Sequence, residues 1–134
     1  EVAIAEASKV IDPKKLILGL PLYGYEWETS SATSSAIIPG SGRTATNKRI
    51  SELLVDCPRC VTGVDQASGE HYVMYPDPKD ASYRVIFYGD SQLMREKLRH
   101  VEWWGGAAVW ALGYENKDDL LPLKTFKNQQ LLFR

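Results

Sequence analysis

The chain has 134 residues, of which 44% are hydrophobic and 25% are charged, and its formal net charge is −1. This nearly neutral charge argues against nucleic acid or an anionic membrane as a partner. No apolar run approaches the roughly 18 to 20 residues of a membrane-spanning helix, so no transmembrane segment is expected. The first residues contain neither a basic region nor an initiator methionine, and we expect the chain to be cut from a longer protein.

The first predicted elements are a helix and a buried strand. Apolar positions with Glu6 and Lys9 between them favour a helix that ends near Ile11, and Pro13 prevents its continuation. The apolar run 16–23 is typical of a strand that is buried on both faces, as in a parallel sheet. Residues 28–43 are rich in Ser, Thr and Gly, which predicts a long surface loop.

A second helix is expected over residues 47–55. Thr46 is its candidate cap, and three apolar residues recur on one face, namely Ile50, Leu53 and Leu54. Aromatic and β-branched residues then predict two strands, 71–75 and 83–88, on either side of a short loop. Antiparallel pairing follows from this arrangement.

The last third of the chain predicts a helix, a second buried strand and a final helix. Asp90 or Ser91 is expected to cap the helix, whose apolar positions are Met94, Leu98 and Val101. The glycine-bounded apolar run 105–112 predicts the strand, with Trp110 near its carboxyl end. Residues 120–134 are the candidate final helix.

Cys57 and Cys60 form a Cys-x-x-Cys motif with three interpretations: a redox motif, half of a zinc site or a local disulfide. Zinc needs two more ligands, and the two histidines, His71 and His100, lack a ligand-like spacing. A redox motif usually opens a helix, whereas this one follows a predicted helix. We favour a disulfide in a secreted parent protein, with two free thiols as the alternative.

Three segments, in this order and spacing, resemble glycoside hydrolase family 18: LILGLPLYG at 16–24, FYGDS at 87–91 and GGAAVWAL at 105–112. This family contains chitinases, chitinase-like lectins and bacterial N-acetylglucosaminidases that act on cell or spore walls. The likeness extends from about residue 9 to about residue 115.

The resemblance implies an α/β fold, the C-terminal part of a (β/α)8 TIM barrel that carries an inserted small α+β domain. The first run matches the seventh barrel strand and the last matches the eighth. A barrel takes roughly 250 residues, so the barrel in this chain is incomplete. The expected divisions are a barrel segment at 1–27, the insertion domain at 28–90 and a second barrel segment at 91–134. Unpaired strand edges predict a partner, either the missing N-terminal barrel half or a second copy.

The family's catalytic residues have no counterpart in this chain. Members carry Asp-x-x-Asp-x-Asp-x-Glu at the fourth strand and Met-x-Tyr-Asp at the sixth, and neither pattern occurs. Asp77-Pro78-Lys79-Asp80 begins like the acidic motif but lacks its other carboxylates. Glycoside hydrolysis needs a general acid. We therefore predict no catalytic residue, no metal and no cofactor here, and no activity for the chain alone.

Four aromatic residues are candidates for substrate binding, three from the resemblance and Trp27 from its place where the strand runs into the loop. Trp110 matches the strand-eight tryptophan on which the family stacks a sugar, and Tyr23 matches an aromatic residue that lines the cleft. Tyr25 stands where many chitinases have arginine, which favours the bacterial wall-active branch. Trp27 is a candidate sugar platform or a residue of the rim. Packing in the barrel core is the alternative for Trp110 and for both tyrosines.

Glu115 is a further candidate, because a carboxylate at a barrel end can accept hydrogen bonds from sugar hydroxyls. Glu26 and Glu28 are weaker candidates of the same kind. An ordinary solvated charge is the alternative for all three. Trp103 and Trp104 precede the last strand and are expected to pack.

The expected function is therefore that of a C-terminal part of a glycoside hydrolase that acts on β-1,4-linked N-acetylglucosamine polymers, chitin or peptidoglycan. A non-catalytic carbohydrate-binding relative, like the chitinase-like lectins, is the alternative. A free-standing interaction module built around the insert is a third possibility. The expected location is extracellular, or associated with a cell wall or spore.

Overall fold

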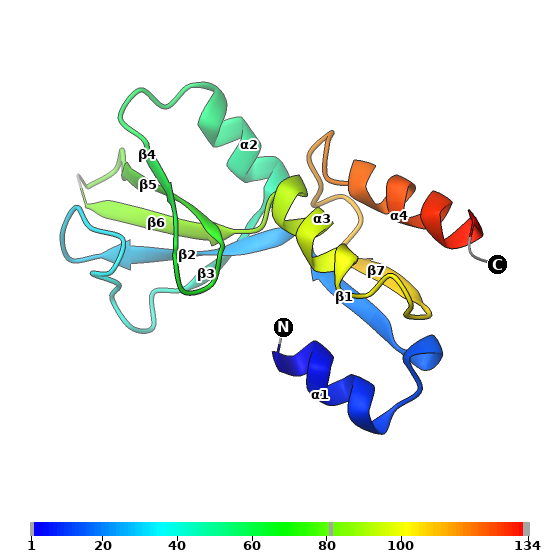
Figure 1. The fold of residues 1–134 in the computed structure, drawn as a ribbon. Helices are drawn as coiled ribbons and strands as arrows, with labels where there is room; N and C mark the ends of the chain where they lie inside the picture. The colour runs from blue at the N-terminus through cyan, green and yellow to red at the C-terminus, as the bar shows by residue number, and fades with distance from the viewer. Residues whose placement is uncertain (1, 81, 133–134) are drawn as a thin grey trace.

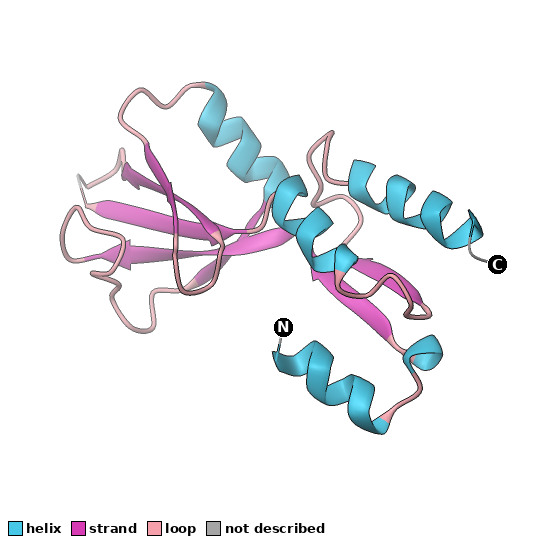
Figure 2. Ribbon diagram, viewed as in Figure 1, coloured by secondary structure: helices cyan, strands magenta, loops and turns pink. Residues whose placement is uncertain are grey.

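The computed structural model describes residues 2–80 and 82–132, which form two separate β-sheets and the helices packed on them (Figure 1). One sheet has two parallel strands, and the other has five strands in the order β3-β2-β6-β5-β4. Three of the α-helices gather around the small sheet, and α2 lies by the large one (Figure 2). No helix among these residues has the length and apolarity to cross a membrane.

The small sheet pairs β1 (Ile17–Pro21) with β7 (Gly106–Trp110). Leu20 lies opposite Val109 in the register, and both face the core. The helices on this side are α1 (Val2–Val10), α3 (Ser91–Arg99) and α4 (Leu121–Leu132), while a short 3-10 helix, Pro13–Lys15, precedes β1. The buried core residues are Leu20, Leu22, Met94, Leu98, Val101, Trp104 and Phe126.

The other face of this strand pair is open, so the prediction of strands buried on both faces is wrong for the described residues. Ile17 and Trp110 both point to this face, and they are 64% and 71% exposed. Alternate residues of a strand point to opposite faces. With helices on one side only, every second side chain has nothing to cover it.

The large sheet is antiparallel throughout and consists of β2 (Tyr23–Thr29), β3 (Arg43–Thr46), β4 (Val61–Val64), β5 (His71–Pro76) and β6 (Tyr83–Tyr88). Helix α2 (Asn47–Val55) covers one of its faces. The core there is made by Ala45, Ile50, Val73, Tyr75 and Ile86. The predicted antiparallel pairing of the segments around 71–75 and 83–88 is confirmed.

The predicted strand 16–23 is in fact two strands in two sheets. Leu22, which is fully buried, separates β1 from β2. Its N–H donates to the Trp110 carbonyl at 2.8 Å, and its own carbonyl accepts from the Asn47 N–H at 3.0 Å. The chain therefore passes from one sheet to the other through a single residue that is bonded on both sides.

Both predicted helix caps are confirmed. The Thr46 hydroxyl accepts from the Arg49 N–H at 3.1 Å, and the Asp90 carboxylate accepts from the first turn of α3.

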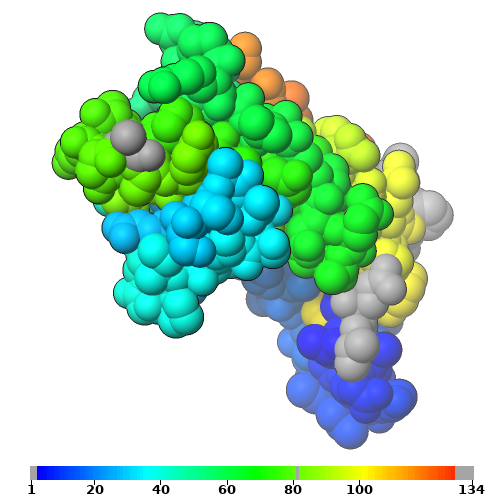
Figure 3. Space-filling model, turned by 90° about the vertical axis from the view of Figure 1, so that its left-hand side faces the viewer, coloured from blue at the N-terminus to red at the C-terminus, as the bar shows by residue number. Residues whose placement is uncertain are grey.

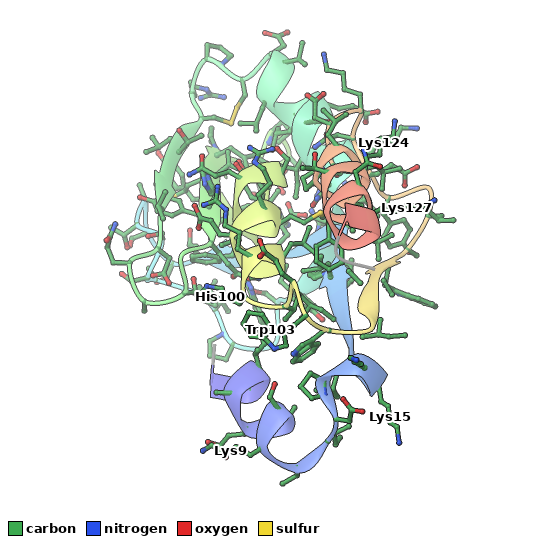
Figure 4. All side chains as sticks on the ribbon, turned by 45° about the vertical axis from the view of Figure 1, so that its right-hand side comes forward. Lys9, Lys15, His100, Trp103, Lys124 and Lys127 are labelled. Carbon is green, nitrogen blue, oxygen red and sulfur yellow. A yellow bond between two sulfur atoms is a disulfide. The ribbon has the colours of Figure 1, made fainter. Side chains whose placement is uncertain are left out.

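Two packing predictions are wrong. Leu54 is exposed, because α2 turns mainly Ile50 toward the sheet. Trp103 is 60% exposed at the turn after α3, near α1 (Figure 4), while Trp104 is buried as expected.

Cys57 and Cys60 form a disulfide at the turn that follows α2, which confirms the favoured interpretation of this motif.

The loop between β2 and β3 lies on the surface beside the large sheet (Figure 3, cyan). An isolated bridge between Thr29 and Ile37 attaches this loop to the end of β2. The expected Ser/Thr-rich surface loop is therefore present and tied back to the sheet.

Candidate functional site

Aromatic side chains form a continuous row along one face of β2. Alternation places Tyr23, Tyr25 and Trp27 on the same side of the strand. The ring centres of Tyr23 and Tyr25 are 5.7 Å apart, and those of Tyr25 and Trp27 are 6.4 Å apart. Tyr114, from the segment after β7, meets Tyr23 edge-on at 6.5 Å. We call these four residues, Tyr114, Tyr23, Tyr25 and Trp27, the aromatic row.

The row presents ring surface to solvent rather than filling a core. Tyr25 is 50% exposed and Tyr114 is 37% exposed, while Tyr23 and Trp27 are partly buried. Large exposed apolar surface in a folded protein commonly marks a binding site. Tyr114 was not among the sequence candidates, although it lies between two of them in the chain and follows the glycine that ends the last apolar run.

Trp110 is the last residue of β7 and lies opposite Pro21, the last residue of β1. Its side chain is on the open face of the small sheet, and the Trp110–Ala111 peptide bond is cis. Because the Trp110 carbonyl accepts from the Leu22 N–H, this residue is bonded to the residue that precedes the aromatic row. The exposed indole therefore lies at the junction of the two sheets.

The phenols supply hydrogen-bonding groups beside these apolar rings. A hydrogen bond with Tyr25 raises the pKa of Tyr23 above its usual value. A tyrosine hydroxyl can both donate and accept a hydrogen bond. An apolar surface edged by hydroxyl groups suits an uncharged polar ligand.

Trp27 is held by the loop before β3. A Cβ atom built on Gly42 would overlap the Trp27 ring, so only glycine lets the loop backbone approach the indole this closely. This contact covers part of one side of the ring. Trp27 thus ends the row at the edge of the surface loop.

Glu115 is not grouped with the aromatic row. Its carboxylate accepts from the Gly113 N–H at 2.6 Å, which closes a local turn. It lines a cavity of about 620 Å³ beside α2, together with Lys48 and Asn116. The Glu115 side chain is therefore part of this local turn beside α2.

Glu26 is buried and is not a solvated carboxylate, which corrects its interpretation as a sugar-binding candidate. It lies on the opposite face of β2 from the row and is 0% exposed. Arg43 and Arg49 each donate two hydrogen bonds to it at 2.6–3.1 Å, and the Tyr75 hydroxyl donates a fifth. Burial alone would raise the pKa of Glu26, but these donors lower it to about 2.

A second ion cluster extends this buried face. Arg84 is paired with Asp77 and, at 3.0 Å, with Glu28. Asp77 therefore has a structural role, which agrees with rejecting the Asp77–Asp80 segment as a catalytic motif. A cavity of about 670 Å³ lies beside these groups and is lined in part by Arg43, Arg49 and Arg84. No cluster of three or more potential metal ligands occurs within the described residues.

No family model matches the chain. An uncharacterized glycosylase, YvbX of Bacillus subtilis (strain 168), is 26% identical over 113 residues, which are 81% of this chain and 30% of that protein. The chain thus spans less than a third of this relative's length.

Several solved structures share the fold of this chain over most of its length. The chitinase from Chromobacterium violaceum ATCC 12472 superposes with a TM-score of 0.74 at 21% identity, over 92% of this chain and 36% of the chitinase. The spore cortex-lytic enzyme SleL from Bacillus megaterium QM B1551 also gives 0.74 at 21%, over 90% and 27%. Human YKL-39, a pseudo-chitinase with retained chitooligosaccharide-binding properties, gives 0.71 at 17%, over 94% and 39%.

The chain shares the α/β fold of part of each of these structures, and this likeness fits the C-terminal part of a family 18 glycoside hydrolase. The resemblance inferred from its three apolar and glycine-containing segments is confirmed. The chain covers well under half of each of the three solved structures.

Proposed function

We propose that this chain forms one wall of the substrate cleft of a glycoside hydrolase that acts on β-1,4-linked N-acetylglucosamine polymers. The observation that carries this proposal is the exposed aromatic row, which begins at the junction where Trp110 is also exposed. One face of a pyranose ring carries mainly C–H groups, and it stacks on a flat aromatic ring, while its hydroxyls need polar partners at the edges. Tyrosine and tryptophan offer both kinds of surface.

Each predicted site residue has a distinct role in this proposal. Trp110 stacks under one sugar, and Tyr23 and Tyr25 offer hydroxyls along the edge of the chain of sugars. Trp27 is the outer platform, because the loop at Gly42 fixes its ring. Glu115 lies at the end of the wall, where its carboxylate would accept hydrogen bonds from sugar hydroxyls.

The catalytic acid in this proposal comes from outside the chain. Hydrolysis requires a carboxylic acid that can protonate the leaving oxygen. The buried carboxylates among residues 2–80 and 82–132 are Glu26, Asp77 and Asp119, and each accepts hydrogen bonds from neighbouring side chains or backbone. None is presented to the aromatic row. The chain alone is therefore predicted to be inactive.

The missing barrel half, or a second copy in its place, would cover the open face of the small sheet. In this arrangement β1 and residues 91–134 belong to the barrel. The expected boundary at 27 moves back to Leu22, because β2, from Tyr23 on, belongs to the large sheet of the inserted α+β domain. β1 and β7 pair with each other only, so each has one free edge in the described part. Free edges of parallel strands favour association with further strands.

The names of the similar proteins support the proposed substrate and the proposed location. SleL is named as a spore cortex-lytic enzyme and the Chromobacterium violaceum protein as a chitinase. These names support a glycan of the peptidoglycan or chitin class. They also support a location outside the cell, or in the cell wall or spore.

The alternative is a carbohydrate-binding protein without hydrolytic activity. Its support is the likeness to human YKL-39, described as a pseudo-chitinase that retains chitooligosaccharide binding. The aromatic row suits both functions equally well. The two differ in the upstream sequence, where a glutamate at the fourth barrel strand is required for hydrolysis and absent from a lectin.

The proposal is tested by titrating the chain with the tetramer of N-acetylglucosamine in a calorimeter. Trp110→Ala is expected to weaken binding about tenfold, or about 1.4 kcal/mol. Trp103→Ala is the matched control, because Trp103 is similarly exposed but lies at the opposite end of β7 (Figure 4). Equal losses in both variants, or no binding by the unsubstituted chain, would contradict the proposal.

A further inference from the structure

The first turn of α2 is hydrogen-bonded to two chain segments, one between the two sheets and one after β7. The Asn47 N–H donates to the Leu22 carbonyl at 3.0 Å, and the Lys48 N–H donates to the Tyr114 carbonyl at 2.9 Å. Leu22 precedes Tyr23, and Tyr114 is itself part of the aromatic row. The N–H groups in the first turn of a helix have no partner within the helix. In α2 two of them donate to the chain segments that carry the aromatic row.

The Asn47 side chain adds two further connections. Its Nδ2 donates to the Asp119 Oδ2 at 3.1 Å and to the Gly89 carbonyl at 3.3 Å. The same Asp119 oxygen accepts from the Asn116 N–H at 2.9 Å. Asn47 thus binds both the connection between β6 and α3 and the segment between β7 and α4.

This pair is buried but belongs to neither apolar core. Asn47 is 3% exposed and Asp119 is 0% exposed, while the two cores are built by other residues. A buried polar pair gains little net stability compared with apolar residues of similar volume. Its specific hydrogen bonds can instead fix one relative placement of the elements that it joins.

We propose that Asn47 and Asp119 are positioning residues that hold Tyr114 and the segment after Trp110 in line with the tyrosines of β2. This inference rests on the proposed function, because it assigns the pair to the geometry of the sugar-binding surface. Without the pair, each sheet keeps its own core, but the two ends of the surface shift relative to each other.

Asp119→Ala tests the proposal by removing the acceptor of both bonds. Asp119→Asn is the conservative variant, because its side-chain carbonyl oxygen can still accept the bonds from Asn47 and Asn116 without a charge. Asp118→Ala is the matched control at the adjacent, exposed position. If Asp119→Ala does not fold, Asn47→Ala replaces it, since it keeps the backbone bond to Leu22.

Two readouts separate positioning from binding. Spin labels at Ile17→Cys and Val64→Cys, exposed positions in the two sheets, report the distance between the sheets. Calorimetry reports the affinity for the N-acetylglucosamine tetramer. Asp119→Ala is expected to broaden the distance distribution and to weaken binding about tenfold. Asp119→Asn is expected to restore both, and Asp118→Ala to change neither.

The proposal is overturned if Asp119→Ala matches Asp118→Ala in the distance distribution, or if its distribution broadens while the affinity stays unchanged. Failure of the unsubstituted chain to bind the tetramer would instead overturn the proposed function. The distance distribution would then still decide whether Asp119 fixes the placement of the two sheets.

Discussion

The two faces of β2 carry opposite chemistry within one seven-residue strand. One face carries Tyr23, Tyr25 and Trp27, of which Tyr25 is half exposed, and the other buries Glu26 among two arginines and a tyrosine. The buried face joins β2 to β3, α2 and β5 through charge-assisted hydrogen bonds. In our proposal the buried face maintains the fold, and the face with the aromatic row binds the ligand.

The largest expected effect comes from breaking the buried face. Glu26→Ala removes the carboxylate that Arg43, Arg49 and Tyr75 share, and we expect a loss of about 3–5 kcal/mol in the free energy of unfolding. Chemical denaturation measures this loss. Glu28→Ala is the control, because Glu28 is partly exposed and makes one ion pair, with Arg84. Similar losses in both variants would contradict the special role of the buried face.

Lowering the pH is expected to reduce the stability that the buried face of β2 provides. The pKa of Glu26 is about 2 in the folded protein and near 4.5 when unfolded. A lowered folded-state pKa stabilises the fold above the unfolded pKa, and this contribution disappears as the pH falls. Stability should therefore drop between about pH 4.5 and pH 2, by about 3 kcal/mol from this group. In Glu26→Gln this part of the drop should vanish; an unchanged pH profile would count against the network.

Tyr25→Ala should leave the free energy of unfolding nearly unchanged, because its side chain is half exposed and its neighbours in the row remain. We expect a change of less than about 0.5 kcal/mol, as for surface substitutions in general. Binding of the N-acetylglucosamine tetramer should weaken several-fold. A large loss of stability with unchanged binding would mean that this face also serves the fold.

The exposed face was more predictable from the sequence than the buried one. Tyr23 and Tyr25 were candidates because the run 16–24 resembles a barrel strand of the family, and Trp27 was a candidate because it follows that run directly. The caps Thr46 and Asp90 are likewise local signals. Glu26 was misread because its partners lie 17, 23 and 49 positions away in the chain. A charge at a strand end gives no sign of such partners.

The strands β3 and β4 were missed for a similar reason. Each has four residues, and their sequences, RTAT and VTGV, carry too little apolar alternation to stand out. They form because β2 and β5 offer free edges for antiparallel pairing. The break at Leu22 was also invisible, since an apolar residue continues the run, and only its bonds to Trp110 and Asn47 separate the two strands.

Mapping the N-acetylglucosamine tetramer on the isotope-labelled chain by NMR tests the contrast between the two faces most directly. We predict that the backbone and indole signals of Trp110, Tyr114 and the β2 residues of the aromatic row shift together on titration. Signals of Arg43, Arg49 and the cavity beside them should stay in place. Shifts confined to that cavity, with the aromatic row unchanged, would contradict the assignment of binding to the exposed face.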